Sequence, residues 1–164
     1  MLVRSLLIAC FLFFIGNMAT MAQAHDYVGV KKCKMCHNKP ATGAQFKQWS
    51  ESKHATAMLS LKGDEAKDPK CLKCHATAGS VKAANMGTLT VAEGVSCETC
   101  HGPGADYNPT AIMKDRAKSI AAGMIIPDEK LCKTCHNPES PHFKGFNYAE
   151  YTKKITHPNP AAAK

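Results

Sequence analysis

The chain has 164 residues, of which 45% are hydrophobic and 21% charged, and its 21 Lys plus Arg exceed its 13 Asp plus Glu to give a formal charge of +8. No shift in composition marks a domain boundary, so we predict one domain in the mature chain. Nine cysteines are many for a chain of this length, and their spacing carries most of the information on function.

Residues 1–24 have the pattern of a targeting segment rather than of a folded element. Arg4 precedes an apolar run, and the segment ends in Ala-Gln-Ala, small residues of the kind at which a signal peptidase cuts. We therefore predict a cleaved signal peptide over 1–24, a mature chain of residues 25–164, and export to the periplasm or the cell exterior. Two alternatives stay open: an uncleaved anchor, because the apolar stretch approaches membrane-spanning length, and lipid attachment at Cys10.

Four copies of the motif Cys-X-X-Cys-His follow in the mature chain. Within each copy the spacing brings both thiols and the imidazole to the same side of one helical turn. This is the geometry of covalent c-type haem attachment, in which the thiols bond to the haem vinyl groups and the imidazole binds the iron from one side. The predicted attachment residues are Cys33, Cys36, Cys71, Cys74, Cys97, Cys100, Cys132 and Cys135, and the predicted proximal iron ligands are His37, His75, His101 and His136.

Zinc sites or disulfides are the competing interpretations of these cysteines. Neither chemistry explains why His follows the second Cys in every copy. Four haem sites use all eight cysteines of the mature chain and leave no thiol for a structural disulfide, which a small exported protein would otherwise be expected to contain. We predict four c-type haems that act as covalent staples, and an apo-chain that is largely unfolded because so short a chain cannot build a sufficient core.

The charge of the mature chain must be corrected for these cofactors. Residues 25–164 carry 20 basic and 13 acidic side chains, a formal charge of +7. Eight ionised propionates would bring the holoprotein to about +3 when oxidised and about −1 when reduced. This cancellation and the predicted export argue against nucleic acid as a partner. The densest basic cluster is Lys31, Lys32 and Lys34, beside the first motif, where the lysines fit a docking surface, a solvated face or propionate partners.

A helix is predicted over residues 42–61. Its opening Thr and Gln resemble a capping box, and Pro40 ends any helix that runs on from the first motif. With 3.6 residues per turn, His54 shares the apolar face with Phe46 and Trp49, so we expect its ring to point inward.

The rest of the mature chain contains several shorter predicted elements. Residues 88–91 are the one strand-like stretch and a candidate for half of a short hairpin, and 102–104 (Gly-Pro-Gly) should turn the chain sharply after the third motif. Helices are predicted over 111–122, from Pro127-Asp128-Glu129 into the fourth motif, and over 147–155, where Asn and Glu again resemble a capping box. The predicted fold class is mainly α with little or no sheet, wrapped around four covalently attached haems.

Four histidines remain outside the motifs, one for each haem: His25, His54, His142 and His157. We predict them as candidate distal iron ligands, because a buried haem iron needs a sixth ligand. His25 stands close to the new terminus that cleavage would create, and His142 lies only six residues after His136, so it would serve a different haem more readily. Methionine is the competing ligand and would raise the reduction potential relative to two histidines. We expect mostly bis-histidine ligation and low potentials.

The sequences YVGVKKCKMCH, from Tyr27 onward, SKHATAM and GVSCETCHGPG together resemble the cytochrome c-554 family of multihaem, tetrahaem c-type cytochromes. The resemblance covers most of the mature chain. It implies a mainly helical fold, haems packed in close pairs, and electron transfer, with His54 and, from the C-terminal region, His157 as distal ligands. The chain departs from the family at Tyr107, where many relatives have a histidine, so the resemblance assigns no distal ligand to the first haem.

Three functional classes are compatible with these residues. The preferred one is an electron-transfer protein, not an enzyme, whose partners are other redox proteins such as cytochromes or a quinol-oxidising membrane complex, without stable membrane insertion after signal cleavage. One alternative is a redox enzyme that acts on hydroxylamine, nitric oxide or nitrite at a five-coordinate haem, because the cytochrome that names the family has one open haem. The other is a subunit of an extracellular filament, in which His25 reaches a haem of the neighbouring chain. The sequence leaves the oligomeric state open.

Overall fold

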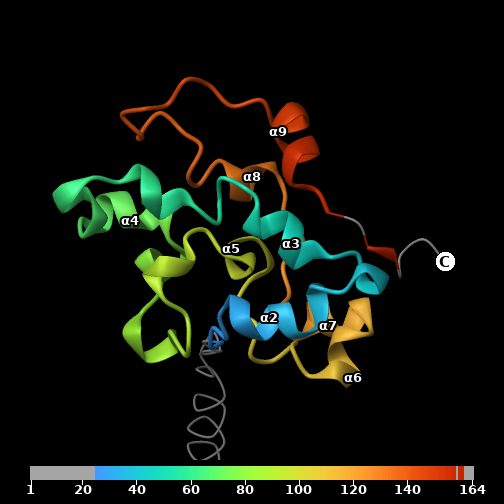
Figure 1. The fold of residues 1–164 in the computed structure, drawn as a ribbon. Helices are drawn as coiled ribbons and strands as arrows, with labels where there is room; N and C mark the ends of the chain where they lie inside the picture. The colour runs from blue at the N-terminus through green and yellow to red at the C-terminus, as the bar shows by residue number, and fades with distance from the viewer. Residues whose placement is uncertain (1–24, 158, 161–164) are drawn as a thin grey trace, which may run out of the picture.

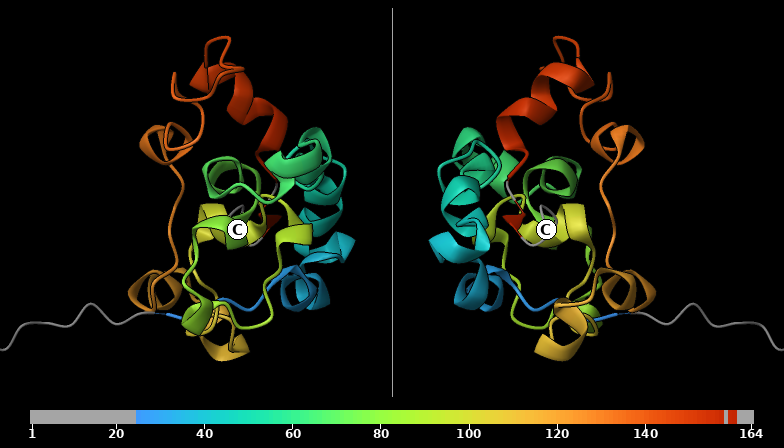
Figure 2. Two further views of the ribbon diagram at one scale, coloured as in Figure 1. Left: turned by 90° about the vertical axis from the view of Figure 1, so that its left-hand side faces the viewer. Right: turned by 90° about the vertical axis from the view of Figure 1, so that its right-hand side faces the viewer.

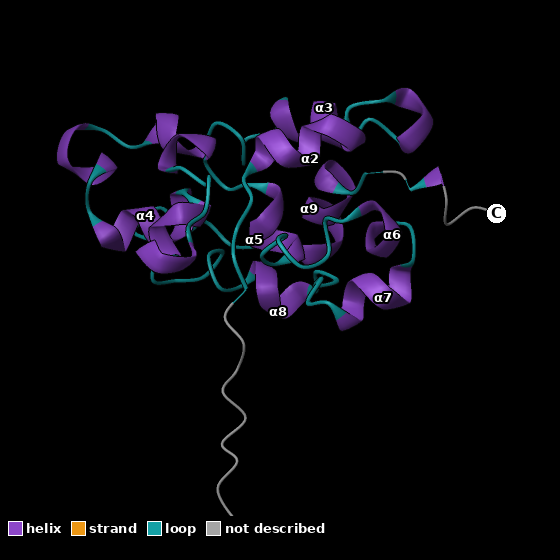
Figure 3. Cartoon of the chain, turned by 90° about the horizontal axis from the view of Figure 1, so that it is seen from below, coloured by secondary structure: helices purple, strands orange, loops and turns teal. Residues whose placement is uncertain are grey.

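The structure is a computed structural model that describes residues 25–157, 159 and 160, so the predicted signal peptide lies outside the described part of the chain. Short helices joined by turns make up the described residues, which contain no strand (Figure 3). The mainly helical fold expected from the sequence is therefore confirmed. The strand expected at 88–91 is wrong: Leu89 bonds locally to the carbonyl of Met86 (2.9 Å), and the chain then enters a 3-10 turn.

All of the described helices are short. The α-helices are α2 (Val30–His37), α3 (Gln45–Ser50), α4 (Pro69–His75), α5 (Cys97–His101), α6 (Thr110–Met113), α7 (Arg116–Ala121), α8 (Glu129–Cys132) and α9 (Tyr148–Ile155). The 3-10 helices are η1 (Pro40–Thr42), η2 (Ala57–Ser60), η3 (Gly63–Ala66), η4 (Thr77–Ser80), η5 (Ala83–Asn85) and η6 (Val91–Glu93). Isolated helices of this length are not stable in water, so tertiary contacts must hold them.

The first three motifs lie on α2, α4 and α5, and each of these helices ends at the histidine of its motif. Gly102, at a φ of 77°, ends α5, as the Gly-Pro-Gly sequence predicts. The fourth motif differs, because α8 ends at Cys132 and the rest of the motif lies in the turns that follow.

The long helix predicted over residues 42–61 is wrong. Only α3 is α-helical there, and Thr42, instead of capping it, donates its hydroxyl to the carbonyl of Lys39 (2.9 Å). Beyond α3 the chain passes through turns to η2, because the carbonyl of His54 accepts the N–H of Val95 (3.0 Å). The indole N–H of Trp49 donates to the Val95 carbonyl (2.9 Å). Docking onto Val95 thus replaces the continuation of the helix.

Caps explain the other helix boundaries. The helix predicted over 111–122 is divided into α6 and α7, because the Asp115 carboxylate accepts the N–H of Lys118 (3.1 Å) and starts a second helix. The predicted starts of α8 and α9 are confirmed: Asp128 accepts the N–H of Leu131 (2.8 Å), and Asn147 accepts that of Glu150 (3.2 Å).

The helices surround α5, which lies near the middle of the molecule, while α9 lies at one end and α6 and α7 lie at the other (Figures 1 and 2). Helix α4 forms a side lobe with η2, η3 and η4, and α2 contacts both α3 and α5. No helix of the described residues is long and apolar enough to cross a membrane.

The buried residues are few and largely polar. Among the described residues the buried hydrophobic ones are Val30, Ala76, Ala78, Leu89 and Tyr107, and the buried polar ones are Thr77, Ser96, Glu98 and Ser119. The Thr77 hydroxyl contacts the hydroxyls of Ser96 (2.8 Å) and Thr99 (2.6 Å), which joins the end of α4 to α5. Hydrogen bonds such as these therefore supplement the small apolar core in holding the motif helices together.

Candidate haem-attachment sites

None of the eight motif cysteines forms a disulfide, and they approach one another across motifs. The Cys97 thiol lies against that of Cys33 and, together with burial, raises the pKa of Cys33 far above its usual value. Burial and then the neighbouring Cys135 raise the pKa of Cys74 to about 11. The first site therefore lies beside the third, and the second beside the fourth.

Three of the proximal histidines are oriented through one ring nitrogen. The Nδ1 of His75 donates to the carbonyl of Ala57 (3.0 Å), that of His101 to the carbonyl of Ile125 (3.3 Å), and that of His37 faces the side-chain oxygen of Gln45 (3.3 Å). A ring N–H donated to oxygen fixes the tautomer and leaves the lone pair of Nε2 for a metal. Each contact is thus of the kind that orients a metal ligand.

Two of the proximal histidines face a second imidazole. The ring centres of His136 and His54 are 6.1 Å apart, and those of His101 and His157 are 5.8 Å apart. Two metal–imidazole bonds of about 2 Å each, with the distance from each nitrogen to its ring centre, add up to about 6 Å. Each pair of rings therefore fits one iron between its members.

The protonation of these rings also suits metal binding. Burial lowers the pKa of His101, His136 and His157, and burial followed by the neighbouring His136 lowers that of His54. All four rings are thus favoured in the neutral form that a ligand needs. The Nδ1 of His157 is a buried nitrogen with no hydrogen-bond partner, which is costly in a folded protein unless another group binds it. The residues present fit an iron-bearing cofactor.

Backbone contacts position the segments that carry His54 and His157. A Cβ at Gly94, whose φ is 62°, would lie only 2.7 Å from the carbonyl oxygen of His54, so glycine is what allows this close approach. The side-chain amide of Gln48 donates to the carbonyl of Thr156 (2.8 Å) and thereby joins α3 to the segment that carries His157.

The remaining two candidate ligands lie elsewhere. The Nδ1 of His25 pairs with the carboxylate of Asp106. His142 is exposed, and its backbone N–H bonds to the hydroxyl of Ser140 (3.3 Å). In the described part of the chain neither ring pairs with a proximal histidine.

Several residues around the sites are not evident from the sequence pattern. Phe146 stacks on His136 with ring centres 4.8 Å apart and an angle of 12° between the planes. Glu98, between the two cysteines of the third motif, is only 2% exposed. A charged residue inside a motif was the only signal that could have singled it out.

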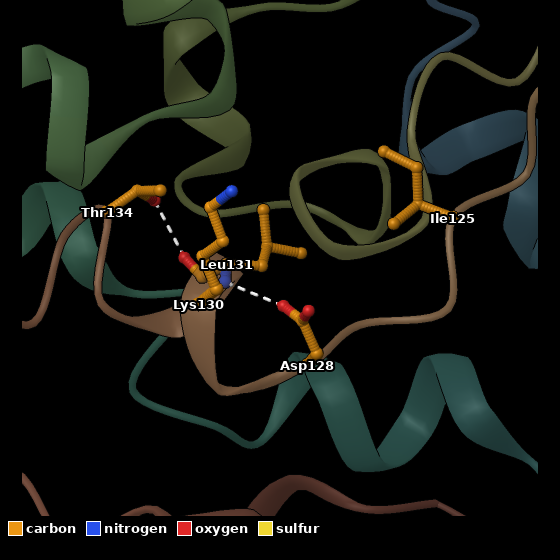
Figure 4. A pocket seen from close by; sticks show the side chains of 5 residues that line it. All are labelled: Ile125, Asp128, Lys130, Leu131 and Thr134. Atoms are coloured by element: carbon orange, nitrogen blue, oxygen red, sulfur yellow. Dashed lines mark hydrogen bonds between the residues drawn. The ribbon is translucent and has the colours of Figure 1, made fainter.

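A cavity of about 250 Å³ lies beside the fourth motif (Figure 4). Its lining residues are Ile125, Asp128, Lys130, Leu131 and Thr134. The carboxylate of Asp128 and the hydroxyl of Thr134 are both engaged with the backbone of Leu131, so the free surface of the cavity is mostly apolar. An apolar wall with one ammonium group suits part of a flat, apolar cofactor that carries carboxylates.

Comparisons with known proteins identify a matching family model, a similar sequence and a similar fold. The family model "Cytochrome c554 and c-prime" matches residues 32–102, which contain the first three motifs. Cytochrome c-554 of Nitrosomonas europaea is 28% identical over 188 aligned positions, which cover 91% of this chain and 75% of that protein. The solved structure of reduced cytochrome c554 from the same organism matches with a TM-score of 0.56 and 26% identity, covering 82% of this chain and 79% of that one.

The relatives and the four motifs lead to the same assignment. The structural match extends over the helical fold, including sequence beyond the residues that the family model covers. The relatives are c-type cytochromes, and the thiol pairs and imidazoles described above have the chemistry that such haems need. The chain is therefore similar to the cytochrome c-554 family over most of its length and is a multihaem c-type cytochrome whose cofactors are four covalently attached haems.

Proposed function

We propose that the protein is an electron carrier in which His54 and His136 ligate one haem iron and His101 and His157 ligate another. The observation that carries this proposal is the 5.8–6.1 Å separation of the two imidazole pairs. Each haem supplies a one-electron redox centre. An iron with a histidine on both faces has no open position for a substrate, so it suits transfer of electrons rather than chemistry on a bound molecule.

The other two proximal histidines, His37 and His75, have an oriented Nδ1 but no paired imidazole among the described residues. This favours a second candidate function: reaction of a small nitrogen compound, such as hydroxylamine, nitric oxide or nitrite, at an iron held by one of them. The filament alternative gains less support, since His25 is paired with Asp106 of its own chain.

We further infer that the carrier docks to acidic redox proteins, such as another cytochrome or a quinol-oxidising complex, through the exposed face of α2. This face comprises Lys31, Lys32, Lys34 and Met35, and Met35 is 66% exposed. An exposed apolar side chain within a basic cluster matches the small, charge-rimmed interfaces of transient redox complexes. Its position beside the exposed Cys36 of the first site makes it a short route for electrons. The predicted signal peptide over 1–24 supports the periplasm as the location, with residues 25–164 as the functional unit.

The decisive test is a spectroscopic count of low-spin and high-spin haems in the purified holoprotein. The carrier proposal requires at least two low-spin haems with two nitrogen ligands each, and a protein mass that includes four haems. Four high-spin haems would rule out both histidine pairs as ligands. One or two high-spin haems that bind hydroxylamine or nitric oxide and turn it over would favour the enzyme alternative.

A further inference from the structure

The carboxylate of Glu98 is bound entirely by backbone N–H groups. Its Oε1 accepts the N–H of Val28 (2.9 Å) and of Gly104 (2.7 Å), and its Oε2 accepts that of Gly29 (2.8 Å). No cationic side chain among the described residues lies within ion-pair distance of it. An ionised carboxylate only accepts hydrogen bonds, so three donors match its charged form.

These bonds join segments that are far apart in the sequence. Val28 and Gly29 lead directly into α2, which carries the first site, while Glu98 belongs to α5, which carries the third. Helix α2 has no acidic residue in its own first turn; Glu93 accepts the N–H of Val30 at its start (2.9 Å), and Glu98 binds the two N–H groups just before it. Glu98 therefore holds α2 against α5.

The charge of Glu98 affects the pKa of two neighbouring tyrosines. Burial and then Glu98 raise the pKa of both Tyr107 and Tyr27 above its usual value. Gly104 packs closely against the carboxylate and helps to exclude water: a Cβ at this position would lie 3.0 Å from Oε1 of Glu98. A buried charge is screened by salt much less than an exposed one, so its effect on the groups around it depends only weakly on salt concentration.

We propose that Glu98 is a positioning residue for the first and third haem sites and that its fixed negative charge lowers the reduction potential of a haem attached there. The oxidised iron carries one more positive charge than the reduced iron, and a nearby anion stabilises the oxidised form. The inference rests on the proposed carrier function. It adds a residue that influences the direction of electron flow, because the haem beside Glu98 gives up its electron more readily.

The test is the substitution Glu98→Gln in the full holoprotein, followed by spectroelectrochemical titration. The amide has the same shape and keeps one accepting oxygen, but it removes the charge. At a fixed applied potential we expect the ferrous-to-ferric ratio of at least one haem to rise about tenfold, which is about 59 mV for one electron. This shift should persist at high salt. The matched control is Glu150→Gln, at an exposed residue of α9, which should leave the ratio nearly unchanged.

A second variant separates charge from structure. Glu98→Asp keeps the charge but shortens the reach to the three N–H groups, so we expect a lower unfolding temperature with potentials near those of the unaltered protein. Glu98→Gln with four haems and unchanged potentials overturns the proposal, as does an equal shift in both variants. If the Gln variant does not mature, the Asp variant decides: potentials near those of the unaltered protein support the role of the charge, and a tenfold change in the ferrous-to-ferric ratio overturns it. Failure of the carrier function itself would appear in the unaltered protein, as four high-spin haems.

Discussion

At the scale of single residues, the four histidines outside the motifs fall into two groups. His54 and His157 are half-buried and face a proximal imidazole, whereas His142 is exposed and His25 is paired with Asp106. The sequence contains four histidines outside the motifs, one for each of the four haems. It contains no information on which of these rings lie next to a proximal histidine. That depends on contacts across the chain, such as the one between Val95 and His54.

Replacing His54 by Ala should turn one haem from low-spin to high-spin and allow it to bind carbon monoxide, because its iron loses one of two imidazoles. Mass spectrometry should still find four haems, since no attachment cysteine changes. Electron paramagnetic resonance and carbon monoxide difference spectra measure the outcome. A folded His54→Ala protein with an unchanged spin-state count would exclude His54 as a ligand.

His157→Ala should have the same effect on a different haem, which His101 holds from the other side. The matched control is His142→Ala, which removes an exposed imidazole and should leave the spin-state count unchanged. Additive behaviour of the His54 and His157 variants, with two high-spin haems in the double variant, is expected because the two ring pairs are separate. A new high-spin haem in His142→Ala would instead transfer the role to His142.

At the scale of elements, local caps are predictable and distant docking is not. Asp128 and Asn147 bond to residues within three positions, so the starts of α8 and α9 follow from the sequence. The end of α3 depends on Val95, which lies more than 40 positions away, and the residues after α3 have no local signal that stops the helix. Glu98 was missed for the same reason, since two of its three partners are 69 and 70 positions away.

The contact between Gly94 and His54 can be tested with a matched pair of glycines. Gly94→Ala should lower the free energy of unfolding by about 2–4 kcal/mol, because the new Cβ combines a strained φ with an overlap against the His54 carbonyl. Gly63 has a similar φ of 54° but nothing within 4 Å of a Cβ, so Gly63→Ala should cost only about 1–2 kcal/mol. Denaturant unfolding of the two holoproteins measures the difference. Equal losses would mean that the overlap is relieved at no cost.

At the scale of the whole molecule, the exposed lysines of α2 should control association with an acidic redox protein. Exchanging Lys31 and Lys32 for Gln should lower the second-order rate of electron transfer several-fold at low salt, because rim charges accelerate encounter. Added salt should reduce the rate of the unaltered protein, since charges are screened over about 10 Å at 0.1 M. Stopped-flow absorbance at several salt concentrations measures both effects.

The control for this docking experiment exchanges Lys144 and Lys153 for Gln, which removes the same charge from exposed positions near the other end of the chain. It should retain most of the rate at low salt. Equal losses in the two double variants would assign the effect to net charge rather than to the α2 face. A rate that does not change with salt in any variant would exclude electrostatic steering.

The bonds between Glu98 and the segment before α2 also determine the order in which the molecule can mature. Val28 leaves the ribosome 70 residues before Glu98, its hydrogen-bond partner. Until the third motif has emerged, the N–H groups of Val28 and Gly29 lack their acceptor, so the segment before α2 stays open. The thiols of the first motif are accessible to the haem-attachment machinery during that interval. A contact of such long range also makes folding slow, which lengthens the interval before the first and third sites close on each other.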